Sequence, residues 1–302
     1  MSFSFDYRKF SFPAILILPL IFSALNTSAQ LFDQGKLKLI SRDFSFTEGP
    51  AVNKRGDVYF TDQSNNKIWK YSAEGSLSLF KDAAGRSNGM YFDRNGQLLT
   101  CADERNELWS ISSDGKVKVL LSDVGGKKLN GPNDLWADRQ GGIYFTDPYY
   151  QRFYWTRQRG EINGQKVYYL PSKKGAKARV VAEDLVKPNG IVGSADGKYL
   201  YIADIEQNKV FRYTIAANGN LSDQTLFINQ GSDGMTIDVQ GNLYLTGKGV
   251  SIYSPAAKLI GHIEIKEPWT GNVCFGGKNR SELFITASTA IYTIPMRTRG
   301  VE

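Results

Sequence analysis

The sequence has little of the histidine, cysteine and helical periodicity that many enzymes and cofactor-binding proteins use. Its one histidine is His262, and its two cysteines are Cys101 and Cys274. A single histidine excludes a histidine-rich metal site. The two cysteines lie within expected strands that are far apart in the sequence, so we expect two buried free thiols, although a disulfide is an alternative in an exported protein. No apolar period typical of a helix extends over a useful length after residue 30.

Clustered basic charge and long apolar runs are also scarce. The formal net charge is +7, but the basic residues are scattered among turns, which favours solubility and disfavours a nucleic-acid partner. The one apolar run, residues 11–25, follows Arg8 and Lys9 and precedes the small residues Thr27 and Ala29. This pattern predicts a signal peptide over residues 1–29, and therefore export to the periplasm or secretion. The run is short for a transmembrane helix, so an uncleaved membrane anchor is the weaker alternative.

One strand-like pattern, in contrast, occurs six times. The copies begin at residues 56, 96, 141, 197, 241 and 281, and most of them follow a polar turn. Each copy is rich in aromatic and β-branched residues, which is typical of a strand. The six segments are "GDVYFTD", "GQLLTCAD", "GGIYFTD", "GKYLYIAD", "GNLYLTG" and "SELFITA".

Further strand-like pieces surround each copy, so that each repeat has four short strands. We therefore predict that residues 30–302 form a single all-β domain, a six-bladed β-propeller. The last repeat has only three strands before the chain ends, and residues 35–41 can supply the fourth. Pairing this N-terminal strand with the last blade would close the ring and remove two open sheet edges. A β-sandwich, the alternative, does not explain six matched units.

Each repeat also carries a polar side chain at one fixed position. Because equivalent positions in a propeller form a ring around the axis, we expect these side chains to converge at one end of the channel. Asparagine and aspartate are common in turns, but a glutamate is not, so turn formation alone explains the pattern poorly. The six ring residues are Glu48, Asn88, Asn133, Asn189 and Asp233, each eight residues before the glycine that begins a copy, and Asn272, nine residues before Ser281.

Four of the ring residues are typical ligands of a hard cation. Glu48, Asn133, Asn189 and Asp233 together offer two carboxylates and two amide oxygens, without histidine or cysteine. This donor set favours Ca²⁺, with Mg²⁺, Mn²⁺ and Zn²⁺ as alternatives. Four side-chain ligands leave coordination positions open for water and substrate. The pattern therefore favours one catalytic divalent cation over a structural one.

The motifs around the ring residues resemble those of a known family. The segments "FTEGPAV", "SNGMYFD", "GPNDLWADRQGGIYFTDP", "KPNGIVGSADGKYLYIAD" and "SDGMTID" are similar to motifs of the SMP-30/gluconolactonase/LRE-like family of six-bladed propellers. The resemblance covers essentially the whole chain after residue 29. It implies a calcium- or zinc-dependent lactonase in which Glu48, Asn189 and Asp233 bind the metal. It also implies that Asn133 is a ligand or substrate contact, and that Asp233 is the acid–base residue.

Two departures leave the substrate open. Some sugar lactonases of the family have an arginine where this sequence has Gly131. The stretch "CADERNE" also differs from the one common in gluconolactonase-like members. The sequence therefore predicts a lactone substrate without naming the lactone.

Hydrolysis of a lactone requires polarisation of its carbonyl group, an activated water and a way to hold the ring. Asp233 is the first candidate for the general base, and Asp134 is the second, although a strand-end aspartate that binds backbone amides is an equally good interpretation of Asp134. A histidine-dependent triad is disfavoured because His262 belongs to an outer-strand segment. The candidate substrate contacts are Asn88, Asn133, Arg86 and Tyr149.

Two other functions fit the same ring. One is a phosphotriesterase that acts at the same cation, and the other is a ligand-binding propeller with a structural Ca²⁺. The lactonase interpretation predicts a small-molecule partner, no contact with a membrane once the signal peptide is removed, and a monomer.

Overall fold

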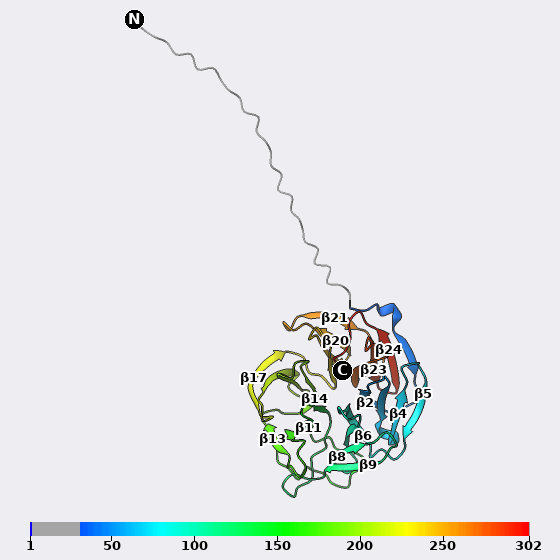
Figure 1. The fold of residues 1–302 in the computed structure, drawn as a ribbon, viewed down its shortest axis with the longest axis vertical. Helices are drawn as coiled ribbons and strands as arrows, with labels where there is room; N and C mark the ends of the chain where they lie inside the picture. Colours follow the sequence, from blue (N-terminus) through cyan, green and yellow to red (C-terminus); the bar gives the residue numbers. More distant parts are fainter. Residues whose placement is uncertain (2–30, 302) are drawn as a thin grey trace.

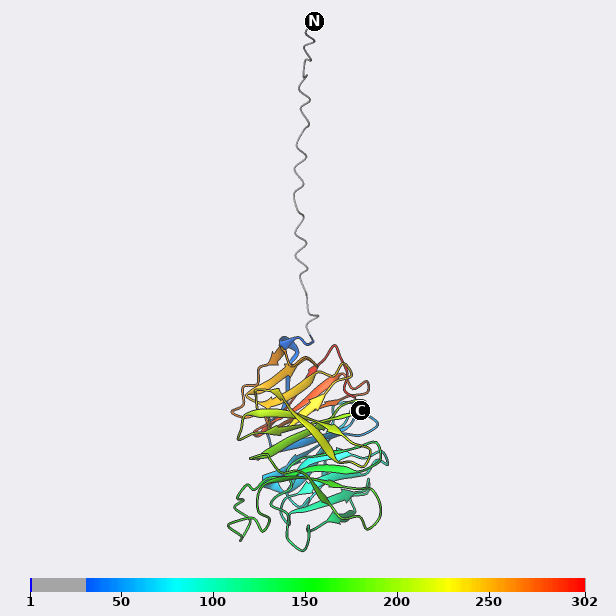
Figure 2. The same cartoon turned by 90° about the vertical axis from the view of Figure 1, so that its left-hand side faces the viewer.

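The chain folds into six four-stranded antiparallel sheets arranged around one central axis. This is seen down the axis in the computed structural model of Figure 1 and from the side in Figure 2. The structure describes residue 1 and residues 31–301. The predicted signal peptide, residues 1–29, lies outside the described residues apart from Met1. Within residues 31–301, the helices are two three-residue 3₁₀ turns, and neither has the length or apolarity that a membrane crossing requires.

The first three blades follow one another along the chain, and in each the strands run in order from the axis outward. Blade 1 contains β2 (Thr47–Val52), β3 (Val58–Asp62), β4 (Lys67–Tyr71) and β5 (Leu77–Lys81). Blade 2 contains β6 (Ser87–Phe92), β7 (Leu98–Ala102), β8 (Glu107–Ile111) and β9 (Val117–Leu121). Blade 3 contains β10 (Leu135–Ala137), β11 (Ile143–Asp147), β12 (Lys166–Leu170) and β13 (Arg179–Ala182).

The next two blades repeat this order, and the sixth uses both ends of the described chain. Blade 4 contains β14 (Pro188–Gly193), β15 (Tyr199–Asp204), β16 (Lys209–Ile215) and β17 (Leu221–Ile228). Blade 5 contains β18 (Met235–Ile237), β19 (Leu243–Gly247), β20 (Gly249–Tyr253) and β21 (Leu259–Ile263). Blade 6 contains β22 (Asn272–Gly276), β23 (Glu282–Ala287), β24 (Ala290–Pro295) and, as its outermost strand, β1 (Lys38–Ser41).

The ring closes through β1, as the sequence predicts. Lys38 pairs with Thr293 and Leu39 with Tyr292 in an antiparallel ladder between β1 and β24. Blade 6 therefore has four strands, and the edge of β24 is covered. The pairing strand is shorter than the predicted residues 35–41, because Gln34–Lys36 form the 3₁₀ turn η1 before it. The Asp33 carboxylate accepts a hydrogen bond from the Gly35 amide and caps that turn.

Burial explains why the repeated segment reads as an almost continuous apolar run. The second strand of each blade has neighbouring blades on both faces, so β3, β7, β11 and β19 are buried at every position. Strands buried on both faces lose the alternation of polar and apolar residues. The outermost strands β5 and β9 are exposed over their first three residues. The hydrophobic core therefore lies between the blades, around the axis.

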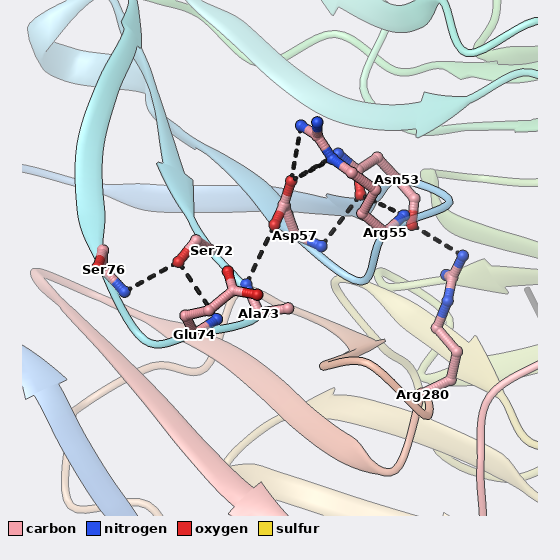
Figure 3. Close-up of polar contacts among 8 residues, drawn as sticks. All are labelled: Asn53, Arg55, Asp57, Ser72, Ala73, Glu74, Ser76 and Arg280. Carbon is pink, nitrogen blue, oxygen red and sulfur yellow. Dashed lines mark hydrogen bonds and ion pairs between the residues drawn. The ribbon is translucent and has the colours of Figure 1, made fainter.

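A turn capped by an asparagine or aspartate side chain joins the first two strands in blades 1, 2, 3 and 5. In blade 1, Asn53 Oδ1 accepts hydrogen bonds from the amides of Arg55 and Asp57 (2.9 and 3.0 Å), and Arg280 of blade 6 donates to the Asn53 carbonyl (Figure 3). Gly56 takes a φ of +88° in this turn, a conformation that glycine adopts without strain. Equivalent carboxylates cap the turns of three other blades: Asp93, Asp138 and Asp238. Strand length and turn together account for the constant eight-residue spacing.

The closure generates a first prediction. Deleting residues 31–41 along with the preceding segment removes β1 and also Phe32, which is buried against the core of blades 5 and 6. We expect loss of a cooperative urea transition, because loss of a buried phenylalanine alone costs roughly 3–5 kcal/mol and β24 would become an open edge. Circular dichroism during urea titration measures this. A chain that begins at Leu31 is the control, and an equal unfolding midpoint for both chains would contradict the role of β1.

Candidate functional site

The six ring residues meet at one end of the channel because each stands at the beginning of an innermost strand. Glu48, Asn88, Asn189 and Asn272 lie at the start of β2, β6, β14 and β22, whereas Asn133 and Asp233 lie just before β10 and β18. Asp233 is half-buried, and the other five are buried. Glu48 is only 4% exposed. A carboxylate this deeply buried needs either a partner or a proton, which distinguishes Glu48 from an ordinary strand-end residue.

Buried aspartates at the ends of second strands hold three ring positions in place. Asp62 accepts hydrogen bonds from the two main-chain amides that lie three and two residues before Glu48. Asp147 does the same before Asn133, and Asp204 does the same before Asn189. These aspartates were not among the predicted site residues. Their signal in the sequence is the aspartate that ends "YFTD", "YFTD" and "YIAD" in three copies of the repeat.

Glycines between neighbouring ring residues allow the side chains to converge. A Cβ atom on Gly89 would lie 2.2 Å from Asp134 Oδ1, and one on Gly234 would lie 2.0 Å from the Asn272 side chain. Contacts this short exclude any larger residue. The glycine that follows the ring residue in "SNGM" and "SDGM" is therefore required so that the next blade can bring its polar side chain to the axis.

Three carboxyl groups, those of Glu48, Asp134 and Asp233, lie near enough to interact electrostatically in this space. Burial, and then the charge of Asp233, raise the pKa of Glu48 well above its usual range. Burial raises the pKa of Asp134 to about 7. The hydrogen bond that Asp134 Oδ1 accepts from the Leu135 amide lowers this pKa and so opposes part of the shift. Burial also raises the pKa of Asp233 to about 6. Asn272 lies beside Glu48 and Asp134 and favours their ionised forms. The group therefore favours a compensating positive charge.

The amides of the ring are free to bind something. Although Asn88 and Asn133 are buried, their side chains form no hydrogen bond with any residue in the described part of the chain. Buried polar groups normally have partners, so these amides are available to a ligand. Within residues 31–301, no three His, Cys, Asp or Glu side chains form a metal-binding group by themselves. A cation here would need amide oxygens besides carboxylates, a donor set that fits Ca²⁺.

Two aromatic residues that are not among the candidate substrate contacts also contact the ring. Trp269 Nε1 donates a 2.6 Å hydrogen bond to Asp233 Oδ2, which favours the ionised carboxylate. Asn189 Nδ2 donates to the Tyr150 hydroxyl at 3.0 Å, which leaves the amide oxygen of Asn189 for another partner. Trp269 comes from the connection between β21 and β22, and Tyr150 from residues 148–165, which we call the mouth loop. Neither connection belongs to the regular repeat, so its pattern could not identify them.

The structure places two predicted substrate contacts against the mouth loop. The Arg86 guanidinium lies 4.5 Å from the ring centroid of Tyr154 and donates to the Ser64 carbonyl. Tyr149 belongs to the loop itself, and its hydroxyl forms a hydrogen bond with Gln151. Their roles in substrate binding, like those of Asn88 and Asn133, stay predictions.

The one histidine and the two cysteines are not among the ring residues. His262 is on β21, the outermost strand of blade 5, where its Nδ1 is 3.2 Å from Ser251 Oγ. Cys101 and Cys274 are buried and free. Both sequence predictions are therefore confirmed, and a histidine-dependent triad at the ring is ruled out by the position of His262.

The opposite end of the channel has a different character. A cavity of about 400 Å³ lies there among the turns that follow the innermost strands, and it includes none of the ring residues. Gly300 and Val301 line this cavity, close to where Figure 1 marks the C-terminus near the axis. The C-terminal segment thus covers part of that end, and the ring of polar side chains lies at the other.

Comparison with known proteins agrees with this arrangement. A family model described as the SMP-30/Gluconolactonase/LRE-like region matches residues 46–289. The chain belongs to this family. The match begins just before β2 and ends just before β24, so it contains all six ring residues. The resemblance predicted from the blade motifs is confirmed.

Members of the family that this chain resembles include lactone-hydrolysing enzymes. A gluconolactonase of Zymomonas mobilis is 27% identical over 296 residues, covering 87% of this chain and 82% of the relative. The structure of a gluconolactonase from Xanthomonas campestris has a TM-score of 0.78 at 26% identity, covering 86% of this chain and 89% of that one. A calcium-binding regucalcin from Agrobacterium tumefaciens shares the fold, with a TM-score of 0.71 at 18% identity and coverage of 87% and 94%.

The raised pKa values generate a second prediction. Without a cation, Glu48, Asp134 and Asp233 hold protons in the folded state at a pH where unfolded carboxyls, with pKa values near 4, are ionised. Their contribution to stability is therefore present at low pH and is lost as the pH rises through about 6–7. Because a bound cation would relieve this loss, we expect Ca²⁺ to raise the melting temperature by more at pH 8 than at pH 5.5.

Differential scanning calorimetry of chelator-treated protein, with and without Ca²⁺, measures this difference. Glu48→Gln is the matched variant, because it keeps the side-chain volume and removes one of the charges. It should weaken both the Ca²⁺ effect and its pH dependence. An equal Ca²⁺ effect at both pH values would contradict the carboxylate group as the cation site.

Proposed function

We propose that this protein is a divalent-cation-dependent hydrolase that opens a lactone, in the manner of a gluconolactonase. The observation that carries the proposal is the ring itself, where three carboxylates and two amides without protein partners converge. The relatives of the chain named gluconolactonase support the reaction class. A purely structural ion would be enclosed by protein ligands, whereas amides without partners suit a site that exchanges ligands.

Glu48, Asn133, Asn189 and Asp233 would hold the cation, and Ca²⁺ fits these oxygen ligands best. The description of the regucalcin relative as calcium-binding agrees with this choice. When bound, the cation would supply Lewis-acid polarisation of the lactone carbonyl. Mn²⁺, Mg²⁺ and Zn²⁺ remain to be compared with Ca²⁺ by experiment.

Asp233 is the residue that we assign as general base. Its carboxylate takes a proton from a water molecule as the water oxygen bonds to the carbonyl carbon. When the ring C–O bond then breaks, the same proton passes to the departing alkoxide. The products are a hydroxyl and a carboxylic acid on one chain, and the acid releases its remaining proton to the solvent. The hydrogen bond from Trp269 Nε1 to Asp233 Oδ2 fixes the orientation of this carboxylate and leaves Oδ1 to accept the proton.

Asp134 is the alternative base. It is more deeply buried than Asp233, and the Leu135 amide already donates to one of its oxygens. Access for water and substrate therefore favours Asp233. The sequence further leads us to propose that the chain acts outside the cytoplasm after loss of residues 1–29, as a monomer, on a small-molecule lactone.

The third prediction tests the base. Asp233→Asn keeps an oxygen ligand and the approximate shape of the side chain but removes the proton acceptor. We expect kcat for an aldonolactone to fall roughly 10²–10⁴-fold, with bound metal retained by elemental analysis. A pH-indicator assay of lactone opening measures the rate.

Asp134→Asn is the comparison variant for this experiment. If turnover of Asp233→Asn equals that of the wild type while Asp134→Asn is inactive, the base is Asp134.

The fourth prediction is that chelation abolishes lactone hydrolysis and that added Ca²⁺ restores it. Full activity after chelation, in protein free of metal, would refute the cation-dependent reaction.

A further inference from the structure

The mouth loop is the longest connection at the ring end of the described propeller. It spans 18 residues between β11 and β12, whereas the corresponding connections in blades 1, 2 and 4 have four residues each. This insertion accounts for the larger spacing between the third and fourth copies of the repeat. Its sequence, "PYYQRFYWTRQRGEINGQ", contains five aromatic residues, three arginines and one glutamate.

The loop is fastened to the propeller close to the ring. Trp155 Nε1 donates to the Asp103 carbonyl at 3.0 Å, and a Cβ atom on Gly131 would lie only 2.9 Å from the Trp155 ring. The Arg157 guanidinium stacks 4.1 Å from the centroid of Trp155 and donates to the Leu129 carbonyl. The loop therefore occupies the space above Gly131, and no larger residue fits there without displacing it.

Blade 2 departs from the aspartate pattern in order to hold this loop. In blades 1, 3 and 4 the aspartate after the second strand binds two main-chain amides of its own blade. Asp103, at the corresponding position of blade 2, instead accepts hydrogen bonds from Arg152 Nε at 2.9 Å and from the Tyr154 hydroxyl. The carboxylate that positions a ring residue in blades 1, 3 and 4 therefore positions Arg152 in blade 2.

Arg152 is held in place through its Nε atom, which leaves its terminal Nη1 and Nη2 groups able to bind a ligand. Its Nε atom is paired with Asp103, and its guanidinium lies 5.5 Å from the centroid of Tyr150, whose hydroxyl contacts Asn189 of the ring. Neither Nη1 nor Nη2 of Arg152 donates a hydrogen bond to any residue that the structure describes. Its charge also acts on Asp233. Two fixed donors thus stand beside the ring without a partner.

The ring and the mouth loop carry charges of opposite sign. The ring presents the carboxylates of Glu48, Asp134 and Asp233, whereas the mouth loop has a net positive charge. The pair of terminal amino groups of an arginine matches a carboxylate in a bidentate geometry. A substrate with an anionic group would therefore orient that group toward the loop and its lactone carbonyl toward the ring.

We propose that Arg152 is a specificity-determining residue that binds a carboxylate carried by the substrate in addition to its lactone group. The preferred substrate is then the lactone of a sugar diacid rather than the neutral lactone of a sugar monoacid. This inference rests on the proposed lactonase function, because it assigns the substrate class of that same site. Tyr150 and Trp269 supply aromatic surface for the sugar ring between the two ends.

The experiment compares two lactones that differ by one group. Glucono-1,4-lactone and glucaro-1,4-lactone have the same ring, and the second carries a carboxylate where the first carries a hydroxymethyl group. We expect kcat/KM of the wild type to be at least about 10-fold higher for the second, the effect of one charge-assisted pair. Arg152→Gln should bring the ratio close to one, mainly through KM of the carboxylated lactone.

Two further variants keep the test decisive. Arg159→Gln removes the same charge from the same loop, at an exposed position that contacts no ring residue in the described part of the chain, and it should leave the ratio unchanged. Arg152→Lys retains the charge but loses the two-pronged geometry, so an intermediate ratio is expected even if Arg152→Gln alters the loop. Melting temperatures report whether each variant is folded.

A binding measurement separates this inference from the proposed function. Isothermal titration calorimetry with glucarate and gluconate, neither of which is a lactone, should show tighter binding of glucarate that is lost in Arg152→Gln. That result supports the carboxylate site even if no lactone is hydrolysed. Hydrolysis of both lactones with a ratio near one, or a ratio that Arg159→Gln lowers as much as Arg152→Gln, would overturn the inference and leave the lactonase intact.

Discussion

The ring depends on hydrogen bonds between a buried aspartate and two main-chain amides. The carboxylates of Asp62, Asp147 and Asp204 each bind the amides three and two residues before a ring position. Charge-assisted bonds of this kind are shorter and stronger than neutral ones. They fix where each innermost strand begins, and so they fix where Glu48, Asn133 and Asn189 point. Precise placement of these donors therefore depends on residues that never face the channel.

This rigidity carries an electrostatic consequence. Because Glu48, Asp134 and Asp233 are held at the end of the channel with little contact with water, burial raises the pKa of each carboxyl group, and the charge of Asp233 adds to the shifts of Glu48 and Asp134. A site with such values binds a proton or a cation according to the pH. The packing that brings these side chains together therefore makes the ionised form of the three carboxyl groups unfavourable when no cation is present. The raised pKa values therefore have their origin in the packing of the innermost strands.

Blade 2 shows how a repeated device can serve a new purpose. The amides that Asp103 would bind by analogy belong to Gly85 and Arg86, and the Arg86 amide instead donates to the Asn66 side chain at 2.7 Å. Because Asn66 takes this place as the acceptor, the Asp103 carboxylate can bind Arg152 and Tyr154 of the mouth loop. The regular part of the propeller provides the ring, and the insertion in blade 3 provides the loop that lies beside it.

The architecture and the ring follow from the sequence because both are periodic. The four-strand repeat, the constant spacing before Gly56, Gly96 and Gly141, and the missing strand of the last blade each follow from counting residues. The shortening of the closing strand by η1 was not predictable in this way, because a 3₁₀ turn of three residues leaves no periodic signal.

Contacts made by irregular segments were decided only by the tertiary structure. Trp269, Tyr150 and Arg152 belong to connections of unequal length, and a connection of 18 residues can reach many places on a propeller. Whether Asp103 binds its own blade or the mouth loop depends on whether Asn66 reaches the competing amide, which no local pattern encodes. The sequence by itself determined the fold and the ring, because repetition forces equivalent residues to one end of the axis. The tertiary structure alone decided what surrounds that ring, because long-range contacts select one path for each loop.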